Sequence, residues 1–206
     1  MTVTGQRAVF ASAARSFAAL VRQIPGDAWD GPGLGDWTVR DLVGHTSRSL
    51  ITVSTYLKTT APHEDVVSAA DYYAQMHEYS ASLGAAAIVE RGRQAGRDLG
   101  ADPAAAIDDL VQKVLAEVDA VDDPLIEVIG GLGIRLSSYL PTRTFEFAVH
   151  SLDIARAVGA DVVPPADVLA DAAALTARIG VALGHGPTVL LALTGRAELP
   201  SAFSVV

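Results

Sequence analysis

Apolar residues recur every three or four positions along most of the chain, which is the spacing of helices that bury one face. The first such run spans residues 6–24, and a second spans residues 39–58. Further helices are predicted over residues 68–99, with a break near Gly84, and over residues 103–121. The pattern therefore predicts a mainly α-helical chain.

Capping residues mark where several of these helices begin and end. Thr38, with an acidic residue three positions later, resembles a capping box, in which two side chains satisfy the first backbone N–H groups. Asp102 and Pro103 combine an N-cap with a proline at the first helical position. Pro141 is predicted to open a later helix, and Gly159 is predicted to end it.

The pattern of residue types changes towards the C-terminus. A helix is predicted over residues 165–183, and two short runs of β-branched and apolar residues follow, over residues 188–195 and 202–206. These runs are typical of two strands, which predicts a β-hairpin. We therefore expect a helical bundle over residues 1–160 and a small extension, a helix plus the hairpin, over residues 161–206.

Composition and charge limit which binding partners and which metal ligands are possible. A formal net charge of −9 opposes binding to nucleic acid or to an anionic membrane, because both partners require a basic face. The absence of cysteine means that a metal site must use histidine and carboxylate ligands. No run of 18 apolar residues and no secretory signal pattern is present, so we expect a cytoplasmic protein.

The helix predicted after Pro141 carries a stripe of charged residues. Glu146, His150 and Asp153 are four and three positions apart, and Arg143 extends the same side of the helix. In one orientation this stripe faces water, as charged faces usually do. In the other it points into the bundle, where a metal ion would balance its charge. The sequence leaves both orientations open.

A second helix offers a third ligand for such an ion. Glu146 and His150 can reach one cation together, and His45, at the edge of its helix's apolar stripe, can face the same interior. The alternative for His45 is a hydrogen-bonded core histidine. Two histidines and one carboxylate would leave positions open for a substrate, as catalytic sites require. Asp153 would then orient a ligand's ring N–H, or else pair with Arg156 at the surface.

Two stretches match the motifs of a known family. DWTVRDLVGHTSRSL, from Asp36 to Leu50, resembles a W-(S/T)-V-R-D-L-x-x-H signature, and TFEFAVHSLDIARAVG, from Thr144 to Gly159, resembles an E-x-x-x-H-x-x-D-x-x-x-A-x-G helix. Both motifs are those of the DinB-like, mycothiol-dependent maleylpyruvate isomerase family. The final LALTGRAELPSAFSVV looks like the T-G-R ending of that family.

The resemblance implies a DinB-like four-helix bundle that binds a divalent metal, commonly zinc, through His45, Glu146 and His150. It also implies mycothiol as a thiol cofactor and a catalytic role for Arg196, which belongs to the T-G-R match. The alternative for Arg196 is a turn residue between two strands. The tail after Gly159 is shorter than the C-terminal domain of the isomerase, so the resemblance does not carry over maleylpyruvate as the substrate.

Three functions fit these observations. The first is a metal-dependent thiol transferase or isomerase, in which an external low-molecular-weight thiol attacks a small electrophile, in keeping with the absence of cysteine. The second is a metal-dependent hydrolase that activates water. The third is a non-catalytic bundle that binds a metal or another ligand. A homodimer is compatible with each of them.

Overall fold

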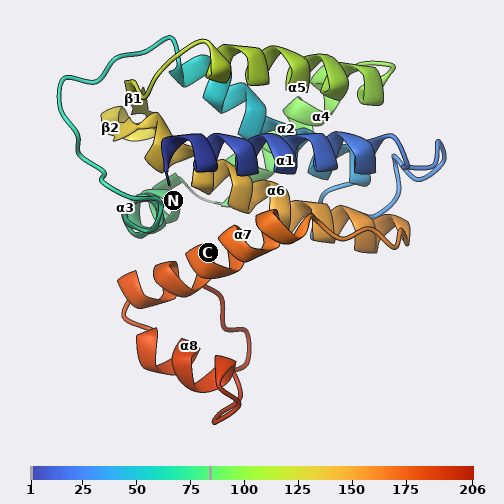
Figure 1. Ribbon diagram of the computed structural model, residues 1–206. Coiled ribbons are helices and arrows are strands. Elements are labelled where there is room, and N and C mark those ends of the chain that lie inside the picture. The colour runs from blue at the N-terminus through green and yellow to red at the C-terminus, as the bar shows by residue number, and fades with distance from the viewer. Residues whose placement is uncertain (1, 84) are drawn as a thin grey trace.

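The architecture is a bundle of long helices with a small β-hairpin at one end and a helical arm that projects from it (Figure 1). This computed structural model describes residues 2–83 and 85–206, without the side chains of residues 77–83 and 85–86. The elements are α1 (Val3–Val21), α2 (Val39–Tyr56), α3 (Ala69–Leu83), α4 (Ala85–Asp98), α5 (Pro103–Asp119), β1 (Leu125–Val128), the 3-10 turn η1 (Ile129–Gly131), β2 (Leu132–Arg135), α6 (Leu136–Val158), α7 (Ala166–Ala182) and α8 (Gly186–Leu193). The predicted mainly helical fold class is confirmed. The predicted break at Gly84 falls on a residue outside the described ones.

Aromatic rings join α1 to α6 in the centre of the bundle. The ring of Phe147, on α6, lies 6.0 Å from that of Phe10 and 5.3 Å from that of Phe17, measured between centroids. All three side chains are buried, and ring pairs at these separations stabilise a core beyond the apolar area they cover. This contact fixes α6, and with it the charged stripe, within the bundle.

The start of α2 is the predicted capping box. The Thr38 hydroxyl accepts a hydrogen bond from the Asp41 backbone N–H, and the Asp41 carboxylate accepts one from the Thr38 N–H, both at 3.1 Å. Further along α2, a Cβ added to Gly44 would lie 2.2 Å from the backbone nitrogen of Gly96 on α4. The two helices therefore touch through their backbones, which holds α4 beside the next residue of α2, His45.

The start of α6 differs from the prediction. The helix begins at Leu136, and Pro141 lies inside it rather than at its first position. Its first turn is held from outside, because the Asp123 carboxylate accepts hydrogen bonds from both the backbone N–H and the hydroxyl of Ser137, each at 2.8 Å. Leu136 is also fully buried. The predicted end is confirmed, since Gly159 takes the left-handed conformation, with φ 68°, that ends a helix.

The only sheet in the described part of the chain is a hairpin between α5 and α6. Strands β1 and β2 pair antiparallel, with Leu125 opposite Arg135 and Val128 opposite Leu132. Gly130, with φ 82°, supplies a positive backbone angle in the turn that links them, a conformation that glycine adopts without steric cost. This hairpin leads directly into the first turn of α6.

The predicted C-terminal hairpin is wrong. Residues 186–193 form α8, and no strand lies within residues 202–206. Short apolar runs do not distinguish a strand from a helix by periodicity, and most of this run is Leu, Ala and Gly rather than β-branched. Pro187 lies in the first turn of α8, where proline suits a helix, and Gly195, with φ 69°, follows its end.

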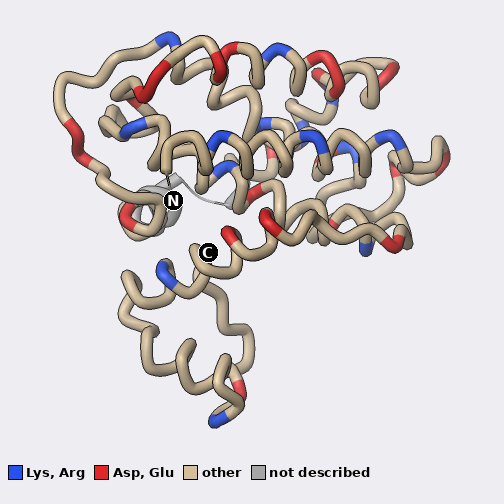
Figure 2. Tube along the Cα trace, in the orientation of Figure 1, with Lys and Arg blue, Asp and Glu red and all other residues tan. Residues whose placement is uncertain are grey.

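Charged residues are spread over the helices of the bundle, while α8 carries none (Figure 2). Among the described helices, none is both long and apolar enough to cross a membrane. α7 packs against α1, α3 and α6, and α8 packs against α7. The domain boundary near residue 160 stays a prediction.

Candidate metal site

Three side chains from two helices converge inside the bundle. α2 supplies His45, and α6 supplies Glu146 and His150. One donor atom of each residue lies within 4.8 Å of the donor atoms of the other two. The side chains of Glu146 and His150 are 22% and 13% exposed, so this part of the stripe faces the interior. That these residues bind a metal stays a prediction, which their convergence supports.

Both sides of α6 are covered, because the side opposite the stripe is buried as well. That side consists of small residues, namely Thr144, Ala148, Ser151 and Ala155, and each is at most 6% exposed. Small side chains allow neighbouring helices to approach closely, which leaves α6 in the middle of the bundle. The stripe therefore points into the bundle rather than towards water. The small opposite side is also packed tightly, which we expected only if the stripe faced water.

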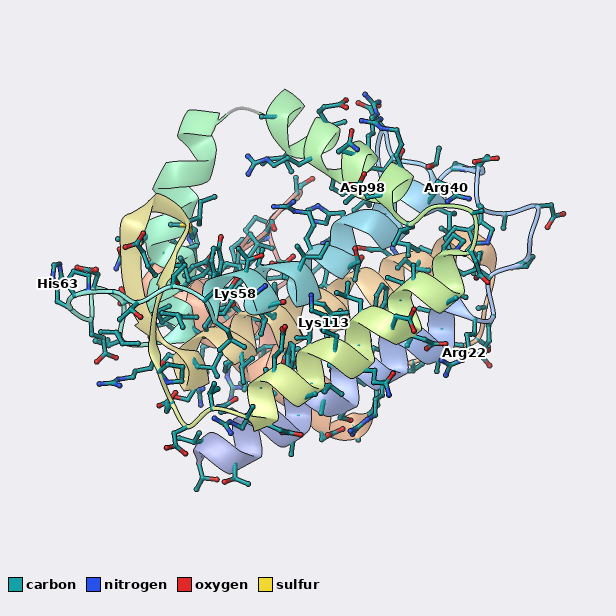
Figure 3. All side chains as sticks on the ribbon, turned by 90° about the horizontal axis from the view of Figure 1, so that it is seen from above. Arg22, Arg40, Lys58, His63, Asp98 and Lys113 are labelled. Carbon is teal, nitrogen blue, oxygen red and sulfur yellow. The ribbon has the colours of Figure 1, made fainter. Side chains whose placement is uncertain are left out.

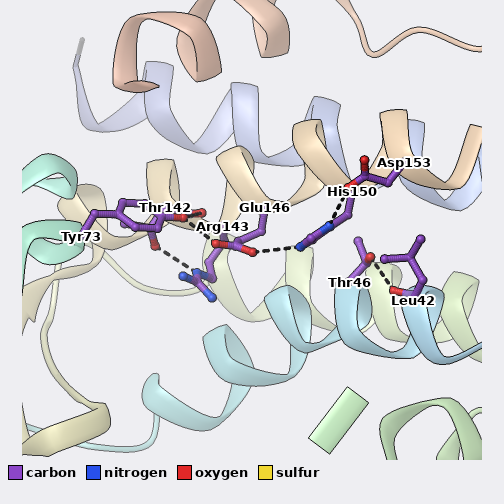
Figure 4. A network of polar contacts seen from close by, with 8 residues as sticks. All are labelled: Leu42, Thr46, Tyr73, Thr142, Arg143, Glu146, His150 and Asp153. Carbon is purple, nitrogen blue, oxygen red and sulfur yellow. Dashed lines mark hydrogen bonds and ion pairs between the residues drawn. The ribbon is translucent and has the colours of Figure 1, made fainter. Parts of the chain in front are cut away.

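A chain of polar contacts runs along the stripe (Figure 4). The Tyr73 hydroxyl, from α3, donates to Glu146 Oε1 at 2.6 Å. The other carboxylate oxygen of Glu146 lies 3.3 Å from His150 Nε2, and His150 Nδ1 lies 3.2 Å from Asp153 Oδ2. The imidazole of His150 is therefore held between two carboxylates.

Asp153 contacts His150, and no ion pair links it to Arg156 within the described part of the chain. A carboxylate on Nδ1 keeps a proton on that nitrogen and directs Nε2 towards Glu146. This is the arrangement that orients a histidine for binding a metal through Nε2. The geometry supports the first of the two predicted roles of Asp153.

Burial and charge act against each other at Glu146 and His150. Burial disfavours the ionised carboxylate, but the hydrogen bond from His150 and the charge of Arg143 outweigh it and lower the pKa of Glu146 to about 2. Burial also disfavours the imidazolium, but the hydrogen bonds to Asp153 and Glu146 outweigh it and raise the pKa of His150 to about 9. At neutral pH the pair is therefore ionised.

His45 has the opposite character. Burial, together with the positive charge of His150, lowers the pKa of His45 to about 4, so its ring is neutral at pH 7. The ring lies 4.4 Å from that of Trp37 and 5.0 Å from that of His150, between centroids. Its Nδ1 atom is buried and has no hydrogen-bond partner in the described part of the chain.

This donor set fits a divalent cation. A neutral imidazole with an unpartnered buried nitrogen is the state in which histidine binds metals. The proton between His150 and Glu146 occupies a position that an ion can take, because deprotonated imidazole and carboxylate are both metal ligands. Imidazole and carboxylate donors suit zinc and similar transition metals.

His45 and Glu146 line a cavity of about 340 Å³, a size suited to a small molecule. Sequence reasoning missed several of its other lining residues, including Tyr73, Arg48 and Arg91. Arg143 also lines the cavity. The sequence pattern indicated this residue, since Arg143 lies on the charged stripe three residues before Glu146. Nothing in the sequence pattern links Tyr73 to the site.

Arg196 is not brought to this cluster. It follows α8, its side chain is exposed, and its guanidinium donates to the Thr194 carbonyl at 3.2 Å. It does not belong to the residues that line the cavity. Among the other histidines, His63 lies on a loop at the periphery of the molecule, and its side chain is 72% exposed (Figure 3).

Comparison with known proteins agrees with the motifs. The family model for the mycothiol maleylpyruvate isomerase N-terminal domain matches residues 10–155, which is more than half of the chain and includes all three candidate ligands. No curated protein and no solved structure gives a match. The match confirms the resemblance seen in the sequence. The chain belongs to the family of the mycothiol maleylpyruvate isomerase N-terminal domain.

Proposed function

We propose that the protein is a metal-dependent enzyme in which an external thiol, mycothiol, attacks a small electrophile, as a transferase or an isomerase. The family supports a mycothiol-related function. The chain has no cysteine, so the sulfur of such a reaction must come from a cofactor. The observation that carries the proposal is the convergence of His45, Glu146 and His150 within 4.8 Å at the edge of a cavity.

The roles of the residues follow from their contacts. His45, Glu146 and His150 would hold the ion, zinc in our proposal, and Asp153 would keep the His150 ring in place through Nδ1. A divalent ion at an open site lowers the pKa of a bound thiol, which makes the thiolate available at neutral pH. The Tyr73 phenol, whose pKa burial and the Glu146 charge raise well above its usual value, stays protonated and orients Glu146.

Three further parts of the proposal concern Arg196, the oligomeric state and the location in the cell. Arg196 would orient or stabilise the electrophile. Val205 and Val206, later in the same segment, already line the cavity, whereas the exposed Arg196 would have to move to reach it. We also propose a homodimer, which light scattering would detect. A cytoplasmic location would give the protein access to a pool of reduced thiol.

Thiol-dependent turnover tests this function. Protein purified without a His tag is assayed with an electrophile, monobromobimane or chlorodinitrobenzene, in the presence and absence of mycothiol. We expect turnover above the uncatalysed reaction only when mycothiol and metal are both present. His45→Ala should abolish it, while His63→Ala, at an exposed position, should leave it unchanged.

The other outcomes identify the alternatives. Metal-dependent turnover of an ester or amide with water alone would favour a hydrolase. Tight metal binding with no turnover and no thermal shift on adding mycothiol would favour a non-catalytic binding protein. Either result would overturn the proposed function.

A further inference from the structure

The side chain of Arg143 places a cationic group in the cavity beside the candidate metal site. Arg143 is on α6, one turn before Glu146, and its guanidinium carbon lies 5.0 Å from the ring centroid of Tyr139 and 5.8 Å from that of Tyr72. Arginine prefers such positions on aromatic faces, where the ring supports the cation without neutralising it. Two rings thus hold the guanidinium in one place.

This guanidinium keeps donors to spare. Its Nε atom donates to the Thr142 hydroxyl at 2.9 Å, as Figure 4 shows. Its two terminal nitrogen atoms make no hydrogen bond, and no carboxylate lies within 4.0 Å of it, in the described part of the chain. A guanidinium can offer two parallel N–H groups to one carboxylate, so an unused pair that lines a cavity favours such a ligand.

The charge of the cavity points the same way. Arg48 from α2 and Arg91 from α4 line it together with Arg143, whereas Glu146 is the one acidic side chain that lines it among the side chains that the structure describes. Both oxygens of Glu146 are already engaged, by Tyr73 and by His150. In a chain of net charge −9, this concentration of positive charge in a concave site attracts anions locally.

The walls of the cavity suit a flat, apolar body. Four tyrosines, Tyr56, Tyr72, Tyr73 and Tyr139, contribute to its lining. Phenol rings offer large apolar faces that pack against planar groups, in stacked or edge-on arrangements. A ligand that places an unsaturated or aromatic part on these rings can direct a carboxylate to Arg143.

We propose that Arg143 is the anion-binding residue of the cavity, and that the cavity selects small aromatic carboxylates. The inference rests on the proposed function only in taking this carboxylate to be the electrophile. Binding itself requires neither thiol nor turnover. Arg143 would then determine which substrates enter, a role separate from the one proposed for Arg196.

A matched pair of probes tests this inference. Benzoate and benzamide have nearly the same shape and differ in charge, and their binding is measured by calorimetry at constant ionic strength, without thiol. We expect the protein to bind benzoate at least about tenfold more tightly than benzamide, the effect of a charge-assisted pair of hydrogen bonds. Equal affinities, or no benzoate binding at millimolar concentration, would overturn the proposal.

Variants then assign the preference to one residue. Arg143→Gln should bring the ratio of the two affinities to about one, while Arg156→Gln, at an exposed position of the same helix, should leave it unchanged. Arg143→Lys keeps the charge and loses the planar pair of donors, so the ratio should fall at least severalfold even if the glutamine variant does not fold.

Metal content is measured in every variant, because benzoate can also bind a metal ion. An unchanged benzoate preference in Arg143→Gln with full metal content would assign the carboxylate to the ion and overturn the proposal. A protein that prefers benzoate but shows no thiol-dependent turnover would keep this subsite and lose the proposed function.

Discussion

At the residue scale, the site depends on one imidazole held between two carboxylates. Asp153 lies 3.2 Å from His150 Nδ1, and Glu146 lies 3.3 Å from Nε2. The first contact fixes the ring, and the second is the one that an ion would replace. The two carboxylates therefore have separate roles, which separate substitutions can test.

The substitution Asp153→Asn tests the role of the outer carboxylate. It leaves all three proposed ligands in place and removes the negative charge of the carboxylate beside His150 Nδ1. Metal affinity should therefore fall by about 10- to 100-fold. Competition with a chromophoric chelator measures that affinity. Asp161→Asn, at an exposed position just beyond α6, should bind metal as the wild type does. Equal affinity in both variants would remove Asp153 from the site.

The pKa values predict how metal binding depends on pH. With the pKa of His150 at about 9, the ring is protonated at pH 7 and must lose a proton when metal binds. His45, with a pKa of about 4, is already deprotonated there. We expect release of about one proton per ion at pH 7, and apparent affinity that rises about tenfold per pH unit until it levels off near the pKa of His150.

Calorimetry in buffers with different enthalpies of ionisation measures this proton release. The sign is fixed by the raised pKa, since metal competes with the proton below about pH 9 and not above it. Metal binding without proton release at pH 7 would contradict the ionised pair of His150 and Glu146.

How far the sequence predicted the site depends on the distance between residues along the chain. Glu146 and His150 are four residues apart, which places them on the same side of one helix, so this part of the site was predictable from the sequence. Whether that side faces water depends on α1, α2 and α7, whose packing no local pattern contains. Tyr73 reaches Glu146 across 73 positions of the chain, so no spacing rule could identify it.

At the element scale, helix ends set by local chemistry were predicted and those set by tertiary contacts were not. The capping box at Thr38 and the glycine at Gly159 act within one helical turn, and both predictions are confirmed. The first turn of α6 depends instead on Asp123, which lies in the segment before β1. The residues that form α8 were predicted as a strand from their composition alone, without a local capping signal, and that prediction was wrong.

The contact between α2 and α4 gives a prediction for a single methyl group. Gly44→Ala would place a Cβ 2.2 Å from the Gly96 backbone nitrogen, so the helices must separate beside His45. We expect the free energy of unfolding to fall by about 1–3 kcal/mol, despite the higher helix propensity of alanine. Denaturant unfolding measures this change.

A loop glycine provides the control for that substitution. Gly26→Ala meets nothing within 4 Å and should change the free energy of unfolding by less than about 0.5 kcal/mol. A Gly44→Ala protein as stable as the wild type would show that the α2–α4 backbone contact is not required.

At the scale of the whole molecule, an acidic chain forms a cavity that is lined by cationic groups. The net charge is −9, yet three arginines line the cavity and two histidines adjoin it or lie at its edge. α2 and α6 hold the candidate ligands, while α8 projects from α7 away from the bundle (Figure 1). The proposed chemistry therefore depends on the bundle and on one ion that these helices would hold together.

Metal stoichiometry tests that dependence most directly. Elemental analysis of untagged wild-type protein should find about one divalent ion per chain, since three converging ligands with an open position form one site. His45→Ala should reduce the content to background, and His63→Ala should retain it. Wild-type protein that stays metal-free after incubation with zinc and removal of the excess, or His45→Ala protein that keeps a full complement of metal, would contradict the account.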